Sequence, residues 1–269
     1  MSVSSNFGPA LWLGQNSTAV NKQTAKPDAG VPKPIVIYSL DDLYAVTSKT
    51  IGGIVFRSTD DLTLFYEGKV ERGTLLYSTN INGTKYKHGT KIEFYPSGKV
   101  KSGILADNAT LNGVVYKDGT LLERSRDGKV EHGTLGADWR IRQGVLKPGT
   151  EVFFDEKGKL SGVILSVRTK IGAIIFSTES IYQHAIIRLL FHKNGRVKGG
   201  LLSADASIQG TAIQGIVCKF DSWVEFHDNG RLKCGILAQD SVIEGHKRKA
   251  GALVKFDRQG AFIKNNWGY

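Results

Sequence analysis

The sequence predicts an all-β protein: a meander of antiparallel β-hairpin repeats, about seven units of about 30 residues, curled into a closed or nearly closed barrel-like body. Three observations lead to this prediction. A glycine-anchored motif recurs at a nearly fixed spacing, apolar residues before each anchor alternate with the period of a strand, and glycine-containing turns separate these segments. Glycine is also abundant, with 32 residues in 269.

Residues 1–35 are expected to form an extended arm, and residues 36–269 to form the hairpin-repeat domain. Four of the six prolines lie within the first 34 residues, which also hold several Ser and Asn residues and a single acid. This composition is typical of a linker. A small apolar cluster, Phe7 with Leu11–Leu13, either docks on the domain or binds a partner. Residues 39–48 are the best candidate for a short helix.

The repeat becomes regular from about residue 52. Each anchor is a glycine that, in the first six units, is followed by a basic residue and a small aliphatic residue. The spacings are 30, 30, 30, 37, 35 and 30 residues. A fixed period of 20–50 residues indicates a repeat architecture, in which stacked units share a core that one unit cannot bury alone. The seven anchors are Gly68, Gly98, Gly128, Gly158, Gly195, Gly230 and Gly260.

Other apolar positions keep phase with the anchor. An aliphatic residue six before it and, in most units, Phe four before it share one face of a strand, as Ile92 and Phe94 do. Leu seven after the anchor has the opposite parity to the aliphatic residue two after it. The glycine between them, such as Gly103, is therefore expected to host a bulge that restores a shared face.

Glycine-containing turns favour antiparallel hairpins over a parallel β-helix. Asn194-Gly195 and Asn229-Gly230 place glycine where a positive φ is wanted, as does Ser97-Gly98. Asp118-Gly119 has the dipeptide of a tight hairpin. Closing the resulting sheet into a barrel would remove its exposed edges.

With these anchors and turns in place, the array over residues 52–264 resembles hairpin-repeat proteins of the MORN type and other bacterial glycine-anchored hairpin repeats. MORN-type units are shorter and carry a denser pattern of glycine and aromatic residues than Gly98-Lys99-Val100 with Gly103 and Leu105. The resemblance implies a binding or scaffolding role with diverse partners. It implies no site residue.

Composition bounds the class of protein. The chain has a net charge of +11 and a pI near 9.5, which excludes an acidic solvating tail, and its 41% hydrophobic residues are enough for a core. No apolar run approaches the length of a membrane-spanning helix, and no secretory signal is evident. Two cysteines cannot form a disulfide scaffold. A cytoplasmic location is therefore expected.

The leading functional hypothesis is a cytoplasmic binding or scaffold module that recognises a protein or a small molecule, because no standard catalytic motif is present. The alternative is a small-molecule enzyme, of the cyclase or isomerase type and possibly of secondary metabolism, with an apolar cavity in the β body. No cofactor and no metal is expected. His192 and His227 occupy the same repeat position, but two ligands alone are a weak metal signal.

Candidate site residues are those that break the repeat. His184 and Arg124 are the catalytic candidates, and Trp139, Trp223 and Tyr182 are the ligand-binding candidates. The imidazole of His184 titrates near neutrality, which suits acid–base chemistry. Arg124 stands where five other units have Phe. If it points inward it needs an anionic partner, from Glu123, Glu151 or a ligand; alternatively, a register slip turns it to solvent. Packing in the core is the alternative role for the two tryptophans.

A basic residue follows each of the first six anchors, and in a stacked array these residues line up along one edge. They form either a binding stripe for an anionic partner or a row of solvated side chains. Nucleic-acid binding is disfavoured, because acids are interleaved with the stripe and no RNA-binding signature is present. This basic ladder consists of Lys69, Lys99, Lys129, Lys159, Arg196 and Arg231.

Overall fold

The computed structural model describes residues 48–58, 61–180, 188–208 and 216–264. All of them belong to one compact unit, Leu40–Tyr269. The expected arm at 1–35 lies outside the described residues, as does the candidate helix at 39–48 except for Ser48, which begins a strand. Every regular element within the described ranges is a β-strand, and these ranges contain no helix able to cross a membrane.

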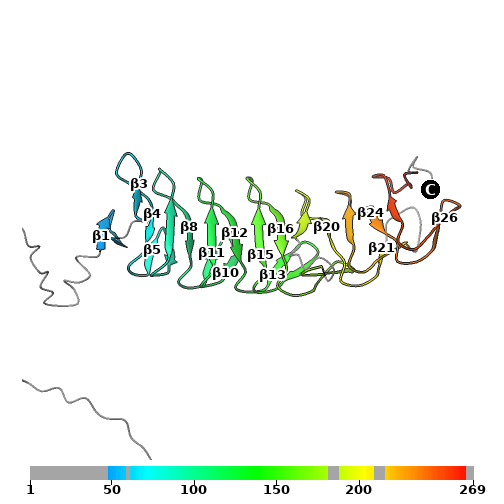
Figure 1. Ribbon diagram of the computed structural model, residues 1–269, viewed down its shortest axis with the longest axis horizontal. Helices are drawn as coiled ribbons and strands as arrows, with labels where there is room; N and C mark the ends of the chain where they lie inside the picture. The colour runs from blue at the N-terminus through cyan, green and yellow to red at the C-terminus, as the bar shows by residue number, and fades with distance from the viewer. Residues whose placement is uncertain (1–47, 59–60, 181–187, 209–215, 265–269) are drawn as a thin grey trace, which may run out of the picture. The chain divides into compact units, whose positions relative to one another are not determined.

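The largest sheet is an antiparallel meander of 13 strands, two from each complete unit (Figure 1). We call it the large sheet. Within this sheet each inner strand pairs with the preceding and the following sheet strand, although the strands of the short hairpins intervene in the chain. The hydrogen-bonded order therefore follows the chain from β3 to β27. The strands are β3 (Thr63–Leu64), β4 (Val70–Thr74), β7 (Lys91–Phe94), β8 (Val100–Ile104), β11 (Leu121–Arg124), β12 (Val130–Thr134), β15 (Glu151–Phe154), β16 (Leu160–Ile164), β19 (Arg188–Phe191), β20 (Val197–Leu201), β23 (Trp223–Phe226), β24 (Leu232–Ile236) and β27 (Leu253–Lys255).

A second layer of short hairpins packs against one face of this sheet. Their two-residue turns at Asn82-Gly83 and Asn112-Gly113 have positive φ at both positions, the geometry that suits the twist of paired strands. The hairpins are β1 (Ser48–Ile51) with β2 (Ile54–Arg57), β5 (Thr79–Ile81) with β6 (Thr84–Tyr86), β9 (Ala109–Leu111) with β10 (Val114–Tyr116), β13 (Trp139–Ile141) with β14 (Gly144–Leu146), β17 (Thr169–Ile171) with β18 (Ile174–Phe176), β21 (Ala206–Ile208) with β22 (Ile216–Cys218), and β25 (Ser241–Ile243) with β26 (His246–Arg248).

The prediction of a tight hairpin at Asp118-Gly119 is wrong. This dipeptide joins β10 to β11, which belong to different layers and do not pair with each other. The backbone N–H of Gly119 donates to the carbonyl of Leu105, and the Thr120 hydroxyl donates to the carbonyl of Lys117. The turn therefore carries the chain from the short hairpin back to the large sheet.

The anchor glycines lie where the sequence predicts a positive φ. Gly98 has φ of 81°, and its N–H donates to the carbonyl of Tyr95 to close the turn between β7 and β8. The predicted bulge also exists, but not at the glycine five after the anchor. The register shifts between Glu93 and Phe94, which leaves Lys101 as the extra residue. The bulge brings both Val100 and Leu105 to the buried face.

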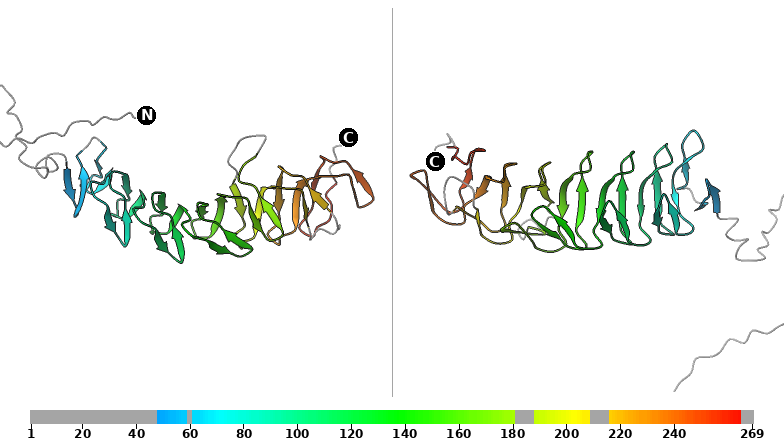
Figure 2. Two further views of the ribbon diagram at one scale, coloured as in Figure 1. Left: turned by 90° about the horizontal axis from the view of Figure 1, so that it is seen from below. Right: turned by 180° about the vertical axis from the view of Figure 1, so that it is seen from behind.

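The core lies between the two layers, and its members are the positions that keep phase with the anchor. Leu105 and Leu135 are fully buried, as are Ile92 and Leu122. The order of the large sheet has two ends, and Figures 1 and 2 show β3 and β27 at opposite ends of the array. The structure therefore does not confirm closure into a barrel. The short hairpins already cover the inner face, so closure is not needed to bury it.

Candidate functional site

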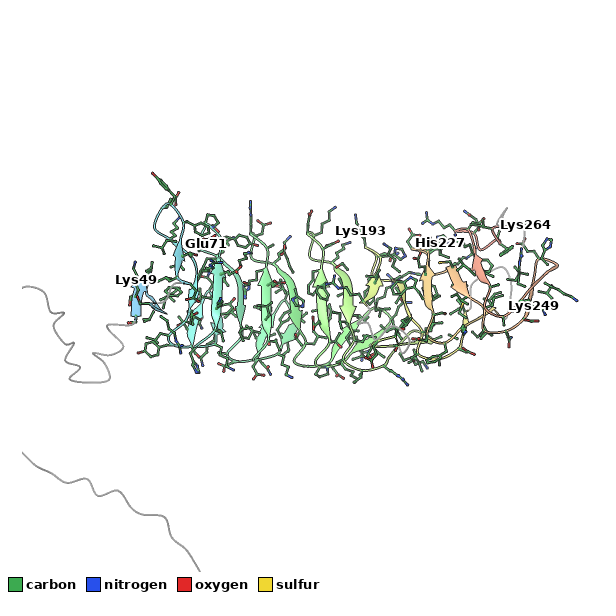
Figure 3. All side chains as sticks on the ribbon, viewed as in Figure 1. Lys49, Glu71, Lys193, His227, Lys249 and Lys264 are labelled. Carbon is green, nitrogen blue, oxygen red and sulfur yellow. The ribbon has the colours of Figure 1, made fainter. Side chains whose placement is uncertain are left out.

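The anchor turns follow one another along one edge of the large sheet, and Figure 3 places Lys193 and His227 on this edge. Neighbouring turns are joined by side chains. Tyr95 Oη donates to the carbonyl of Arg124, and His192 Nε2 and His227 Nε2 donate to the carbonyls of Phe226 and Phe256. In each case the first residue of one turn reaches the residue that precedes the next turn, about 30 residues further along the chain.

In three other anchor turns the first residue bonds within its own turn instead of reaching the next one. Asp155 Oδ1 accepts from the backbone N–H of Lys157 and of Lys159, and Asp257 Oδ1 and Ser125 Oγ each accept from an N–H of their own turn. The histidine pair therefore has a structural function that links repeats. In the described part of the chain no cluster of three or more His, Cys, Asp or Glu residues could hold a metal.

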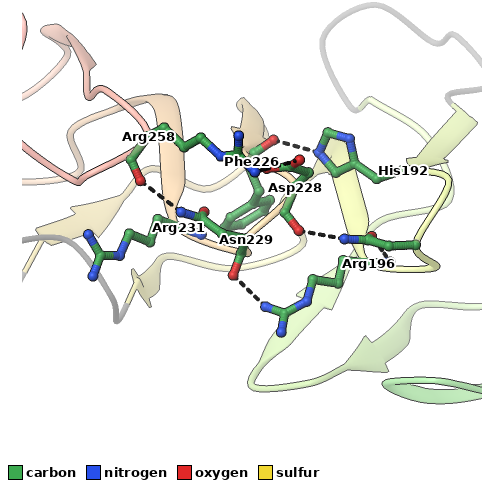
Figure 4. A network of polar contacts seen from close by, with 8 residues as sticks. His192, Arg196, Phe226, Asp228, Asn229, Arg231 and Arg258 are labelled. Atoms are coloured by element: carbon green, nitrogen blue, oxygen red, sulfur yellow. Dashed lines mark hydrogen bonds and ion pairs between the residues drawn. The ribbon is translucent and has the colours of Figure 1, made fainter.

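The basic ladder also joins successive turns. Lys99 Nζ lies 3.4 Å from the carbonyl oxygen of Asp127, and Lys159 Nζ lies 3.3 Å from that of Lys193. Arg196 donates to the carbonyl of Asn229 in the same way (Figure 4). These acceptors are neutral, so the bonds orient the cations without neutralising their charge.

In the described part of the chain, five clefts border these turns. One of them, of about 520 Å³, is lined by Asp155, His192 and Asp228 and lies outside the series described next. The other four share one design, in four successive units. Each is bordered by the tip of a short hairpin, by a ladder residue with its aliphatic neighbour, and by the anchor glycine of the following unit. In order along the chain their volumes are about 450, 300, 280 and 140 Å³. The second and third clefts share Trp139, Phe154 and Gly158. We call the four clefts together the turn-edge groove.

The lining of the turn-edge groove is basic around an apolar floor. It contains eight basic side chains and a single acidic one, Asp127, whereas the whole chain has 36 basic and 25 acidic residues. The eight are Lys99, Arg124, Lys129, Arg142, Lys157, Lys159, Lys193 and Arg196.

None of these eight forms an ion pair with another described residue. Some basic residues elsewhere do so, at pairs such as Lys85–Asp107, Lys101–Glu93 and Lys147–Asp138. Other described cations, such as Lys91 and Lys117, also lack an ion pair, but the groove gathers eight of them around an apolar floor with one acidic residue, which makes it a surface suited to an anionic ligand.

Arg124 is half-buried and lines the first cleft. Its strand has the same bulge as the other anchor hairpins, so no additional register slip turns it to solvent. Its Nη2 donates to Thr84 Oγ1 at 2.6 Å, and its Nε is buried with no hydrogen-bond partner among the described residues. Glu123 and Glu151, the expected partners, lie instead against His132 on the large sheet.

The charge of Arg124 acts on the tyrosines of the short hairpins. Burial raises the pKa of Tyr116 to about 12 and also raises the pKa of Tyr86, and Arg124 opposes both shifts by favouring the phenolate. The cation thus lies beside neutral hydroxyl groups. Asp127 lines the same cleft, but Arg124 forms no ion pair with a described carboxylate.

The two tryptophans do not converge on one site. Trp139, on β13, lines the second and third clefts, with its ring 6.0 Å from that of Phe154. Trp223, on β23, faces away from the short hairpins and covers Gly199, where an added Cβ would lie 2.9 Å from its ring. Arg124 and Trp139 therefore belong to the turn-edge groove, and Trp223 does not line it. Tyr182 and His184 lie outside the described residues.

Sequence reasoning missed several lining residues. Phe154 was recognised as a repeat position, but not as the floor of a cleft, and Arg142 and Lys193 were not singled out. The turn of β13–β14 carries Arg142, and its Nη1 lies 3.5 Å from the carbonyl of Asn194. A signal was present, because the basic ladder marks one side of each cleft and the recurring Phe lines the second, third and fourth. Comparison with protein-family models and with curated proteins finds no match to this chain.

Proposed function

We propose that the protein is a repeat binding module that uses the turn-edge groove to recognise an elongated protein partner. The observation that carries this proposal is the recurrence of one cleft design in four successive units. Equivalent sites in a row suit a ligand that engages several of them at once, since linked weak contacts add up to useful affinity. The MORN-type resemblance of the array agrees with such a role.

Site-specific photocrosslinking in the native host tests this proposal. A benzophenone amino acid at Lys157 places the reactive group in the second cleft, and the same group at Lys91 places it on the outer face of the large sheet; both positions are exposed. We expect a discrete protein adduct from position 157 and none from position 91. Adducts at 91 alone, or at neither position, would reject the groove as the binding surface.

A second candidate, the small-molecule enzyme, is favoured by the fourth cleft. Its walls are mainly apolar, with Phe176, Ile208 and Phe226, and a few polar groups such as Gln143 and Arg196 converge on it. Apolar walls with a few converging polar groups are typical of small-ligand pockets, and a volume of about 140 Å³ restricts the ligand to a very small molecule. Native mass spectrometry of protein purified from its host distinguishes the candidates: a stoichiometric small-molecule adduct favours the enzyme, and a protein complex favours the binding module.

A further inference from the structure

The spacing of the clefts sets the repeat of any ligand that fills them in order. Each unit contributes two strands to the large sheet, and neighbouring strands are about 4.8 Å apart. Successive clefts are therefore roughly 10 Å apart. Three residues of an extended polypeptide span about 9–10 Å, whether in a β or a polyproline II conformation. A peptide lying along the groove thus presents every third side chain to an equivalent position.

The charges of the groove determine which side chain that is. One ladder cation borders each cleft: Lys99, Lys129, Lys159 and Arg196 in order along the chain. Carbonyl oxygens hold the head groups of all of these except Lys129. No described carboxylate pairs with them. Apolar residues beneath them lower the local dielectric, which strengthens attraction to an incoming anion. A carboxylate at every third residue matches this arrangement.

The floor of the groove favours a polypeptide over a nucleic acid. Trp139 and Phe154 pack against each other with their rings inclined by 52°. These rings are not arranged as a row of parallel platforms on which successive bases stack. Small apolar side chains between the acidic ones fit the spaces beside Val130 and Leu160.

We propose that the turn-edge groove binds an extended acidic peptide segment that carries a carboxylate side chain at every third residue. This inference rests on the proposed function and specifies the partner of the same groove.

Fluorescence anisotropy with the full-length chain tests the inference. The probe is a labelled peptide of about 15 residues with the repeat Leu-Pro-Glu, whose prolines favour the extended conformation. One comparison peptide has the same composition with its glutamates in one block, and another has Gln in place of Glu. We expect the regular peptide to bind at least about tenfold more tightly than either. Equal affinity for the regular and the block peptide would overturn the periodic match.

A pair of charge-reversal variants locates the site. The variant K129E/K157E changes two groove cations whose side chains make no bond to another turn in the described structure, so folding is expected to be retained. The control K91E/K255E makes the same change of net charge on the outer face. The first pair should weaken the regular peptide by about tenfold or more and the second by less than about twofold at physiological salt. Equal losses, with both variants shown to be folded by circular dichroism, would overturn the assignment.

The remaining outcomes separate the inference from the proposed function. If a single-stranded oligonucleotide of equal charge binds the groove and the peptide does not, the acidic polypeptide is rejected in favour of nucleic acid. If neither probe binds but position 157 still crosslinks to a protein, the binding module stands and the acidic repeat is rejected. If position 157 yields no crosslink and no probe binds, both proposals fail.

Discussion

Gly133 lies directly against the ring of Tyr116: a Cβ built on Gly133 would be 2.6 Å from Cδ1 of the tyrosine. The same approach recurs at Gly103 against Tyr86, where the distance would be 2.7 Å. These glycines of the large sheet therefore make room for the aromatic rings of the short hairpins, and their absent side chains are part of the packing between layers.

In the fourth unit a larger side chain on the large sheet is matched by a smaller one on the short hairpin. It has Val163 where the third unit has Gly133, and Leu146 where the third has Tyr116. We predict that Gly133→Val alone destabilises the protein by about 1–3 kcal/mol or more through overpacking. The double variant G133V/Y116L should lose less than the sum of the two single changes, as measured in a urea-unfolding double-mutant cycle. Strict additivity would contradict the compensation.

The bond from Tyr95 to the next turn should contribute measurably to stability. Tyr95→Phe removes the hydroxyl that donates to the carbonyl of Arg124 at 2.8 Å. We expect a loss of roughly 0.5–1.5 kcal/mol in the free energy of unfolding. Tyr66→Phe is the matched control, because Tyr66 is fully exposed in the first anchor turn and should leave stability unchanged. Similar losses in both variants would argue against a link between repeats.

Stability should decrease in alkaline solution. Burial raises the pKa of Tyr116 from about 10 in the unfolded chain to about 12, and that of the Cys218 thiol from about 9 to about 11. The folded state therefore keeps protons that the unfolded state releases, and full stability is retained only below about pH 9. Tyr116 alone accounts for roughly 2–3 kcal/mol, lost between pH 10 and 12.

Chemical unfolding at a series of pH values measures this loss. Tyr116→Phe should flatten the decline between pH 10 and 12, whereas Tyr66→Phe should leave it as in the parent chain, because Tyr66 is exposed. A decline that is the same in both variants would show that other groups govern alkaline unfolding.

Arg124 tests the relation between the repeat and the groove. Most other units have Phe at this position, as at Phe94 and Phe154, so Arg124→Phe should fold and keep its stability within about 1 kcal/mol. It also removes a cation from the first cleft, and we expect the affinity for the acidic peptide to fall several-fold. Arg124→Lys keeps the charge and is the control. Full affinity in the Phe variant would show that Arg124 takes no part in binding.

The residues that determined the fold class act locally. Gly98 and Gly195 supply positive φ in their turns, and Ile92 and Phe94 alternate along one strand, so propensity and periodicity were sufficient to predict antiparallel hairpins in a repeat. The tight hairpins of the second layer were missed, although Asn112-Gly113 has the typical dipeptide. Asp118-Gly119 carries an equally good turn signal but connects two layers, which local sequence does not distinguish.

The sequence by itself determined the repeat, the all-β class and the residues that face the core, because each depends on conformational preferences within one unit. Only the tertiary structure decided that short hairpins cover the inner face of an open sheet, that Gly103 is required by the ring of Tyr86, and that cations such as Lys99 hold the turn of the next unit. These features join residues that lie some 17–30 positions apart. Their contacts arise from packing between the two layers and from stacking of the units, which the conformational preferences of neighbouring residues do not encode.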